Sequence, residues 1–225
     1  MQTLYISEIF SSIDGEGIYT GNPATFIRLS GCNLKCRFCD TGYASQLQCG
    51  EEMELNDIIN SACNYKNKRI TLTGGEPLLQ PNSLNLIKEL TNRGFLVNIE
   101  TNGSLPVDKI LALPNADNIT ITMDYKSSSS LCGNSNPEKY ICQLRTKDVL
   151  KFVLIESDFE ECFSILRDNK INAIIFLSPV YGECDPLALV EFAKSISTRL
   201  PEYSERVRFQ LQLHKILWDP NKRGV

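Results

Sequence analysis

Hydrophobic positions along the chain follow two alternating spacings, which predict strands and helices in turn. Short runs of apolar and β-branched residues predict buried strands, whereas apolar positions at i, i+3, i+4 and i+7 predict helices. The first pattern occurs at residues 4–10, 24–30, 69–73, 95–99, 119–123, 149–155, 173–177 and 207–213. The second occurs at residues 55–63 and 82–93, and further helices are predicted from Ser157, in a capping-box sequence, and from Pro186.

This alternation predicts a parallel sheet with right-handed crossovers, and therefore an α/β fold. The 225 residues suffice for one large core, and no boundary or repeat divides them, so residues 1–225 are expected to form a single domain. The predicted helices are few for a complete barrel. We therefore expect an abbreviated, partial TIM-type (β/α) barrel with mostly parallel strands.

Composition is that of a soluble globular protein, with 42% hydrophobic and 22% charged residues. The net charge of −4 argues against nucleic-acid binding, and the apolar runs are too short to span a membrane. The N-terminus lacks the features of a secretory signal, so a cytoplasmic location is expected. In that reducing compartment the nine cysteines are expected to bind metal or to pack in the core. Cys63 and Cys162, at apolar positions of predicted helices, are assigned to the core.

Three cysteines, Cys32, Cys36 and Cys39, lie within eight residues of one another in a predicted loop. Thiolates are preferred ligands of zinc and of iron–sulfur clusters. A four-iron cluster held by three cysteines leaves one iron open, which is what a catalytic metal needs. A structural zinc site needs a fourth ligand, for which Cys49 is the nearest candidate.

Polar and glycine-rich motifs follow the predicted strands at residues 32–41, 74–77, 100–103, 124–126 and 178–179. The carboxyl ends of parallel strands meet at one edge of a sheet, and in barrel-type α/β enzymes that edge carries the active site. The sequence therefore predicts an enzyme, or at least a ligand site, at this edge.

The spacing of Cys32, Cys36 and Cys39, followed by Gly-Gly-Glu-Pro at residues 74–77, resembles the radical S-adenosylmethionine (SAM) enzymes. The additional motifs at residues 13–17, 28–34, 39–41, 73–77 and 213–215 resemble the 7-carboxy-7-deazaguanine synthase family, over residues 5–218. This resemblance implies the radical SAM fold. It also implies a [4Fe–4S] cluster held by Cys32, Cys36 and Cys39, with the amino and carboxylate groups of SAM on the fourth iron.

The same resemblance implies a carbon–nitrogen lyase reaction that requires SAM and Mg²⁺. In this family 6-carboxy-5,6,7,8-tetrahydropterin undergoes ring contraction to 7-carboxy-7-deazaguanine with release of ammonia, on the route to queuosine and other 7-deazapurines. The implied partners are the pterin substrate, an electron donor such as flavodoxin or ferredoxin, and a second copy of the chain in a homodimer.

Residue roles are also implied by the resemblance, and catalysis is assigned to the cofactors rather than to a side chain. Glu16 suits the guanidine-like donor edge of a pterin, and Arg28, unusual inside a strand, suits its carboxylate. Thr41 is implied as a ligand of Mg²⁺. The implied substrate-binding residues are Ile13, Asp14, Gly15, Glu16, Arg28, Thr73 and His214. The implied SAM-binding residues are Phe38, Cys39, Asp40, Gly74, Gly75, Glu76, Asp124, Tyr125 and Lys126.

Two alternative functions are compatible with the cysteine motif. A glycyl-radical-enzyme activase of the same superfamily has similar length and cysteine spacing, but it acts on a protein chain and needs no pterin pocket, so Glu16, Arg28 and Thr41 argue against it. A non-enzymatic zinc or iron–sulfur module is the second alternative, and the clustering of polar motifs at strand ends argues against it.

Overall fold

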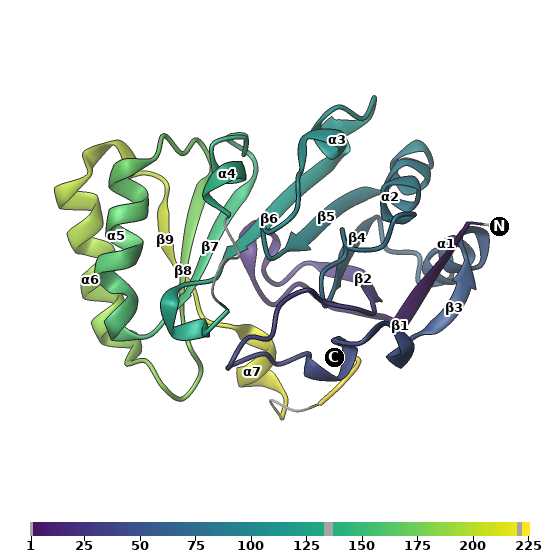
Figure 1. The fold of residues 1–225 in the computed structure, drawn as a ribbon, viewed down its shortest axis with the longest axis horizontal. Coiled ribbons are helices and arrows are strands. Elements are labelled where there is room, and N and C mark those ends of the chain that lie inside the picture. The colour runs from purple at the N-terminus through teal and green to yellow at the C-terminus, as the bar shows by residue number, and fades with distance from the viewer. Residues whose placement is uncertain (1, 133–136, 220–221) are drawn as a thin grey trace.

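The structure is a computed structural model that describes residues 2–132, 137–219 and 222–225. These residues contain the strands β1 Thr3–Ile13, β2 Pro23–Leu29, β3 Glu51–Glu54, β4 Arg69–Gly74, β5 Leu96–Thr101, β6 Ile119–Tyr125, β7 Val149–Leu154, β8 Ile174–Pro179 and β9 Val207–Phe209. They form one nine-stranded sheet of order β3-β1-β2-β4-β5-β6-β7-β8-β9. All neighbouring pairs from β2 to β9 run parallel, and β1 runs antiparallel to both β2 and β3 (Figure 1).

The helices of the described residues are α1 Leu55–Asn64, α2 Ser83–Asn92, α3 Asp108–Leu111, α4 Glu138–Ile141, α5 Phe159–Asp168, α6 Pro186–Arg199 and α7 Leu213–Leu217. Short 3₁₀ turns occur at η1 Gly17–Tyr19, η2 Gly42–Ala44, η3 Leu47–Cys49, η4 Ala116–Asn118, η5 Ser128–Ser130, η6 Glu156–Asp158 and η7 Pro201–Tyr203. Figure 1 shows α5 and α6 beside β7–β9 at one end of the sheet and α1 and α2 at the other. The expected α/β fold with mostly parallel strands is confirmed, and the open sheet is that of a partial barrel.

Side chains alternate between two buried faces of the sheet. In β6 the apolar Ile119, Ile121 and Met123 are fully buried in the hydrophobic core, which the helices complete. Thr122 and Asp124 point to the opposite face, where both line a cavity. We call this second side the inner face. Because successive side chains of a strand point in opposite directions, one short sequence supplies both the core and a polar site wall.

The N-terminal half of the sheet departs from the expectations at two strands. β1 extends to Ile13 and pairs there with Pro23, three residues beyond the strand expected at residues 4–10. β3 was not expected, because Glu51–Glu54 carries three glutamates. This strand lies at the sheet edge and pairs with β1 alone, so its charged side chains reach solvent and discourage pairing with another chain.

Three further expectations are corrected. Residues 210–213 are not a strand, since β9 ends at Phe209 and α7 begins at Leu213. Ser157 does not cap α5, because the N-cap residue is Asp158, whose side chain makes no capping hydrogen bond to this helix and accepts one from the backbone N–H of the preceding Ile155. Cys63 is exposed, because it falls at the edge of the buried face of α1, whereas Cys162 is buried as expected.

The start of α6 is confirmed, because the Asp185 side chain accepts a hydrogen bond from the backbone N–H of Leu187 and Pro186 occupies the first turn. No helix found in residues 2–132, 137–219 or 222–225 has the length and apolar character needed to cross a membrane.

Candidate active site

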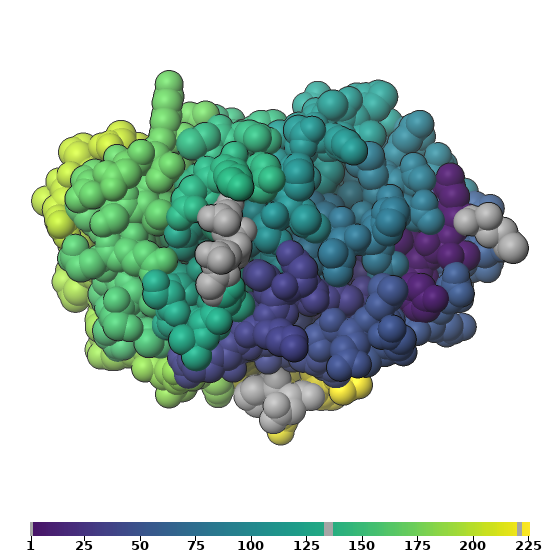
Figure 2. Space-filling view, in the orientation of Figure 1, coloured from purple at the N-terminus to yellow at the C-terminus, as the bar shows by residue number. Residues whose placement is uncertain are grey.

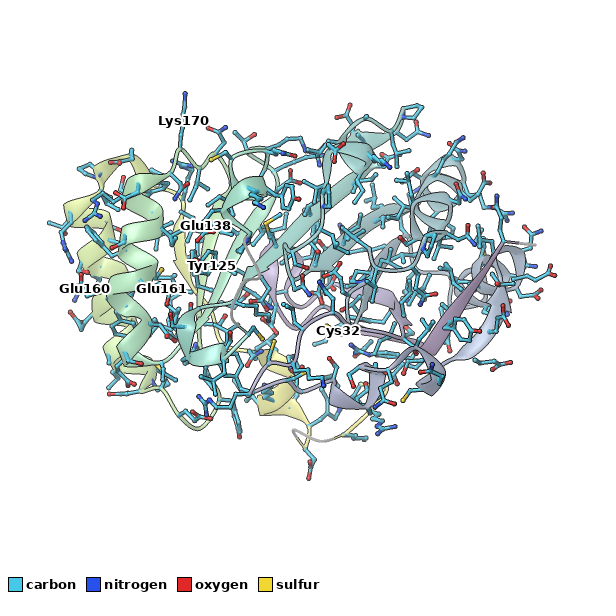
Figure 3. All side chains as sticks on the ribbon, viewed as in Figure 1. Cys32, Tyr125, Glu138, Glu160, Glu161 and Lys170 are labelled. Carbon is cyan, nitrogen blue, oxygen red and sulfur yellow. The ribbon has the colours of Figure 1, made fainter. Side chains whose placement is uncertain are left out.

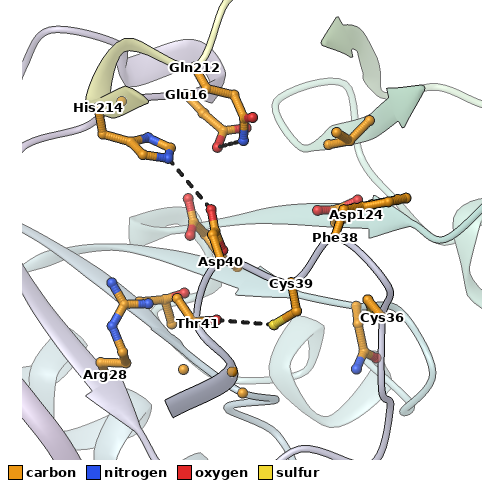
Figure 4. Close-up of a pocket in the computed structure, with 18 of the residues that line it drawn as sticks. Glu16, Arg28, Cys36, Phe38, Cys39, Asp40, Thr41, Asp124, Gln212 and His214 are labelled. Carbon is orange, nitrogen blue, oxygen red and sulfur yellow. Dashed lines mark hydrogen bonds and ion pairs between the residues drawn. The ribbon is translucent and has the colours of Figure 1, made fainter. Parts of the chain in front are cut away.

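A cavity of about 930 Å³ opens at the carboxyl ends of the parallel strands. Its wall includes residues from four of the five motifs predicted at strand ends, within residues 32–41, 74–75, 100–102 and 124–126. Of the fifth motif, Ser178 and Pro179 are buried and do not line the cavity, although the next residue, Val180, does. Figure 4 shows the cysteine loop facing Glu16, Gln212 and His214 across this space. The sequence-based expectation that the motifs converge at one edge of the sheet is therefore met for four of the five.

The cysteine loop, residues 32–41, is held in place by backbone hydrogen bonds at its start and near its middle. The backbone N–H of Cys32 donates to the carbonyl of Ser45 at 2.8 Å, and the N–H of Arg37 donates to the carbonyl of Ser130 at 2.9 Å. The Arg37 guanidinium also forms a bidentate ion pair with Glu183, at 3.0 and 2.8 Å. Figure 2 shows this segment, in indigo, at the molecular surface next to the teal segment that follows β6. The loop is thus fixed near the opening of the cavity.

The residues present fit a [4Fe–4S] cluster. Cys32, Cys36 and Cys39 all line the cavity, and their sulfur atoms are the donors that such clusters use. Within the described part of the chain, no three His, Cys, Asp or Glu side chains are grouped tightly enough to hold a single metal ion. A cluster does not need that arrangement, because each cysteine binds a different iron.

Cys132 was not singled out by the sequence, yet its Sγ lies 3.1 Å from the Sγ of Cys36. It follows η5, whose Ser130 accepts the hydrogen bond from the cysteine loop. No motif marks it, because its position depends on how two loops distant in sequence pack. Cys49, the candidate fourth zinc ligand, is exposed on η3.

Two glycines let the end of β4 approach the cysteine loop closely. A Cβ atom added at Gly75 would lie 2.4 Å from the carbonyl oxygen of Gly31 and 2.7 Å from the Cβ of Cys32. At Gly74, where φ is +154°, an added Cβ would lie 2.3 Å from the carbonyl oxygen of Leu29. Only glycine fits here, so backbone rather than side chain is presented to the cavity. This is the surface that the sequence assigned to SAM.

Glu76 and Tyr125 were assigned to SAM, but neither lines the cavity. Glu76 is fully buried, and its carboxylate accepts hydrogen bonds from Thr101 Oγ1 and from the backbone N–H groups of Leu78 and Asn102. Burial raises the pKa of this carboxyl group. Tyr125 points away from the cavity toward Glu138, to which its hydroxyl donates at 2.9 Å (Figure 3). Both side chains therefore bond to other protein groups outside the cavity and hold the residues of its wall in place.

A buried network of charges forms the inner part of the cavity. Lys151 Nζ lies 2.9 Å from Glu16 Oε2 and 3.2 Å from Asp124 Oδ2. Asp124 also pairs with Lys126 at 3.0 Å, and Glu16 Oε1 accepts a hydrogen bond from Gln212 at 2.8 Å (Figure 4). Burial acts to raise the pKa of both carboxyl groups, but the neighbouring lysines more than offset it, so both pKa values are lowered. Glu16 is therefore an ionised acceptor at neutral pH.

His214 and the adjacent lysine hold Asp40, the residue after the last cluster cysteine. His214 Nε2 and Lys215 Nζ lie 3.6 and 3.4 Å from Asp40 Oδ2. Burial would raise the pKa of Asp40, but these two neighbours lower it well below its usual range. On its other side His214 packs against Gly15, where an added Cβ would lie 2.8 Å from Nδ1. The histidine from α7 thus joins the cysteine loop to the loop after β1.

Arg28, Thr73 and Thr41 all line the cavity. The Arg28 guanidinium donates through Nε to Glu8 at 2.6 Å, and the Tyr43 hydroxyl donates to the same carboxylate oxygen. Thr73 donates a hydrogen bond to Glu100, whose pKa is raised mainly by burial. Thr41 Oγ1 lies 3.7 Å from the Sγ of Cys39. These contacts orient the side chains along the wall of the cavity.

Asp14 lies outside the cavity wall, although its neighbours Ile13 and Gly15 line it. Its side chain is 1% exposed and accepts a hydrogen bond from Thr71 at 2.6 Å. Its backbone N–H and carbonyl bond to Asn22 and Gly21. These contacts of Asp14 all face the protein, and its sequence-based assignment to the substrate gains no support from its position.

The buried carboxyl group of Asp14 predicts how the stability of the fold depends on pH. Burial raises its pKa from 3.8 to about 7, and its Oδ2 has no hydrogen-bond partner among the described residues. Between these two values the unfolded chain releases a proton that the folded protein keeps, so stability falls as pH rises, at about 1.4 kcal/mol per pH unit. Asp14→Asn keeps the acceptor for Thr71 and removes the titration. We expect the variant to lose this slope in denaturant unfolding measured from pH 4 to 8. Parallel stability profiles for the two proteins would contradict the assignment.

Comparison with known proteins identifies the class. The radical SAM superfamily model matches residues 26–193, about three quarters of the chain, and the chain belongs to this superfamily. It is therefore an enzyme whose family implies a [4Fe–4S] cluster and SAM as cofactors, in agreement with the cysteine loop and the glycine cradle.

Within that superfamily the chain belongs to the 7-carboxy-7-deazaguanine synthase family. It is 38% identical to the synthase of Clostridium acetobutylicum, covering 98% of each chain. It is 37% identical to the synthase of Methanospirillum hungatei, over 96% of this chain and 86% of that one. The crystal structure of QueE from Escherichia coli has the same fold, with a TM-score of 0.73 at 22% identity over 95% of this chain and 96% of that chain.

Proposed function

We propose that this enzyme converts 6-carboxy-5,6,7,8-tetrahydropterin to 7-carboxy-7-deazaguanine by a radical ring contraction that releases ammonia. The observation that carries the proposal is Glu16, an acceptor kept ionised by Lys151 in the same cavity that holds the cysteine loop. A pterin presents a guanidine-like edge of N–H donors, and a buried carboxylate is a strong and selective acceptor for such an edge. The names of the relatives at 31–38% identity support the same product.

The chain's own residues bind and orient the substrate. We assign the donor edge of the pterin to Glu16 and to the backbone around Ile13 and Gly15. Arg28 is assigned to the substrate carboxylate, because its hydrogen bond to Glu8 uses Nε and a guanidinium carries two further donor nitrogens. His214 is assigned to the wall of the pocket, where Asp40 fixes its ring.

When bound, the cluster and SAM supply the hydrogen-atom abstraction that begins the rearrangement. Around them, Gly74 and Gly75 present backbone rather than side-chain atoms to the cavity. The ion pair between Lys126 and Asp124 sets the charge of the cavity wall. The proposal includes a small electron carrier such as flavodoxin or ferredoxin as reductant, and a second copy of the chain as partner in a homodimer. The pathway assigned is that of queuosine and other 7-deazapurines.

The decisive experiment is anaerobic incubation of the reconstituted enzyme with SAM, a reductant and the carboxypterin, followed by mass spectrometry of the products and an ammonia assay. Formation of 7-carboxy-7-deazaguanine together with ammonia is expected. Reductive cleavage of SAM with the pterin unchanged would refute the proposed substrate and return the activase alternative to consideration. An absence of iron and sulfide after reconstitution would instead favour the zinc module.

The proposal assigns Thr41 to Mg²⁺. One neutral hydroxyl holds this ion only weakly, so oxygen atoms of the substrate and water must complete its coordination. We expect turnover of the parent enzyme to rise with added Mg²⁺. Thr41→Ser keeps the oxygen and should retain the response, whereas Thr41→Ala should blunt it while the iron content stays unchanged. The assignment fails if the alanine variant responds to Mg²⁺ as the parent does.

A further inference from the structure

Lys151 occupies an unusual position, because it is a lysine within a fully buried strand. All six residues of β7 are buried, and Leu150, Phe152 and Leu154 are 0% exposed in the apolar core. Lys151 points to the inner face and lines the cavity. In the register of the parallel pair, it lies opposite Asp124 of β6. No sequence motif contains it.

The ammonium group of Lys151 bridges two carboxylates that come from different parts of the site. Lys151 contacts Glu16 from the loop after β1 and Asp124 from β6. Among the described residues, Lys126 pairs with Asp124 but not with Glu16, and Gln212 bonds Glu16 but not Asp124. Lys151 is therefore an ion-pair link between Glu16, which is assigned to the substrate, and Asp124, which is assigned to SAM.

The surrounding charges show why an ammonium is needed at this point. Glu16, Asp124 and Glu100 all act to raise the pKa of Lys151, and they overcome the opposing effect of burial. A buried ion pair rarely stabilises a fold more than apolar side chains of equal volume. That comparison applies when the whole pair is replaced; a methionine at position 151 alone would fill the space but leave Glu16 and Asp124 without their shared cation. The presence of lysine is thus explained by the two carboxylates that it holds, of which Glu16 is the one assigned to the substrate.

We propose that Lys151 is a positioning residue that holds the Glu16 carboxylate in the orientation that accepts the donor edge of the substrate. The inference rests on the proposed pterin substrate and deepens it. Lys151 acts through Glu16 and does not itself touch the reacting atoms. Without Lys151, the one side-chain hydrogen bond that Glu16 would keep among the described residues is that from Gln212, and its carboxylate could turn toward other donors.

The test is Lys151→Met, which keeps the length of the side chain and removes the charge. Loss of a charge-assisted contact predicts a KM for the pterin raised about tenfold to hundredfold. SAM affinity should change less than about threefold, because Lys126 still holds Asp124. Lys151→Arg keeps a cation and should recover most of the pterin affinity. Lys147→Met is the matched control, since Lys147 lies just before the same strand, bonds to the carbonyls of Ala116 and Asp117, and should leave KM unchanged.

A double-mutant cycle with Glu16→Gln separates positioning from general support of the structure. If Lys151 acts through Glu16, the double variant binds the pterin no more weakly than Glu16→Gln alone. Thermal unfolding and iron content verify that each variant is folded and loaded. Multiplication of the two fold-changes, or an equal loss of SAM affinity, would overturn the inference while the proposed function stands. A parent enzyme that neither binds nor converts the pterin would overturn both.

Discussion

Replacing Cys32, Cys36 or Cys39 with alanine is expected to abolish cluster formation, whereas the same change at Cys132 is expected to leave it intact. The three loop cysteines face the cavity, and each supplies the one thiolate that its iron takes from the protein. Cys132 lies outside the cavity wall, although its sulfur touches that of Cys36. After anaerobic reconstitution we expect about four irons per chain in the Cys132→Ala variant and background iron in the three others.

Cys132→Ala is the strict control because the Cys132 sulfur lies 3.1 Å from that of Cys36, one of the loop cysteines. Cys49→Ala tests the zinc alternative and should also keep its iron. A loss of iron in either control variant would add a fourth protein ligand and remove the open iron on which the proposed mechanism depends. Turnover should follow the iron content in every case.

Glu76→Ala is expected to lower the free energy of unfolding by about 3–5 kcal/mol, the largest stability effect that we predict. The change removes a fully buried carboxylate that joins the end of β4 to the end of β5. It leaves three donors unpaired, namely the Thr101 hydroxyl and the N–H groups of Leu78 and Asn102. Each buried donor left without an acceptor costs about 1–3 kcal/mol, and the three costs overlap because the donors share one partner.

The measurement is chemical denaturation of the unreconstituted protein, so that cluster loss does not enter the result. Glu76→Gln keeps one carboxamide oxygen as an acceptor and should lose about half as much. Glu89→Ala, at an exposed position of α2, is the control and should stay within about 0.5 kcal/mol of the parent. If Glu76→Ala behaves like that control, the carboxylate does not hold the two strand ends together.

Much of the fold was predictable because its strands are short, apolar and separated by clear helical patterns. The predictions for β4, β7 and β8 agree with the structure to within one or two residues. The errors share a cause, since they occur where pairing or packing overrides the local pattern. Glu51–Glu54 becomes a strand through its pairing with β1, and Leu213 leaves the sheet to begin α7 beside Gly15.

The parts of the candidate site that belong to sequence motifs were predictable. The cysteine loop and the two glycines carry local signatures, and the cavity brings them together. Lys151 and Gln212 carry no signature, because their roles arise from partners far apart in the sequence. A lysine at the centre of an apolar strand was the available signal for Lys151. Glu76 belongs to a recognisable motif, but the motif does not reveal whether its side chain faces the ligand or the scaffold.

The hydrogen bonds that hold the loop after β1 in place also constrain when the site can form during synthesis of the chain. Gln210 bonds Gly17, and Gln212 bonds Glu16, across separations of 193 and 196 residues. At about 5–20 residues per second, the ribosome delivers these glutamines roughly 10–40 seconds after Glu16. Contacts between such distant residues form late, because a long loop must close first. Through most of translation the loop after β1 and the cysteine loop therefore lack their contacts with the C-terminal segment. A nascent chain stalled before Gln210 would expose both loops to solvent.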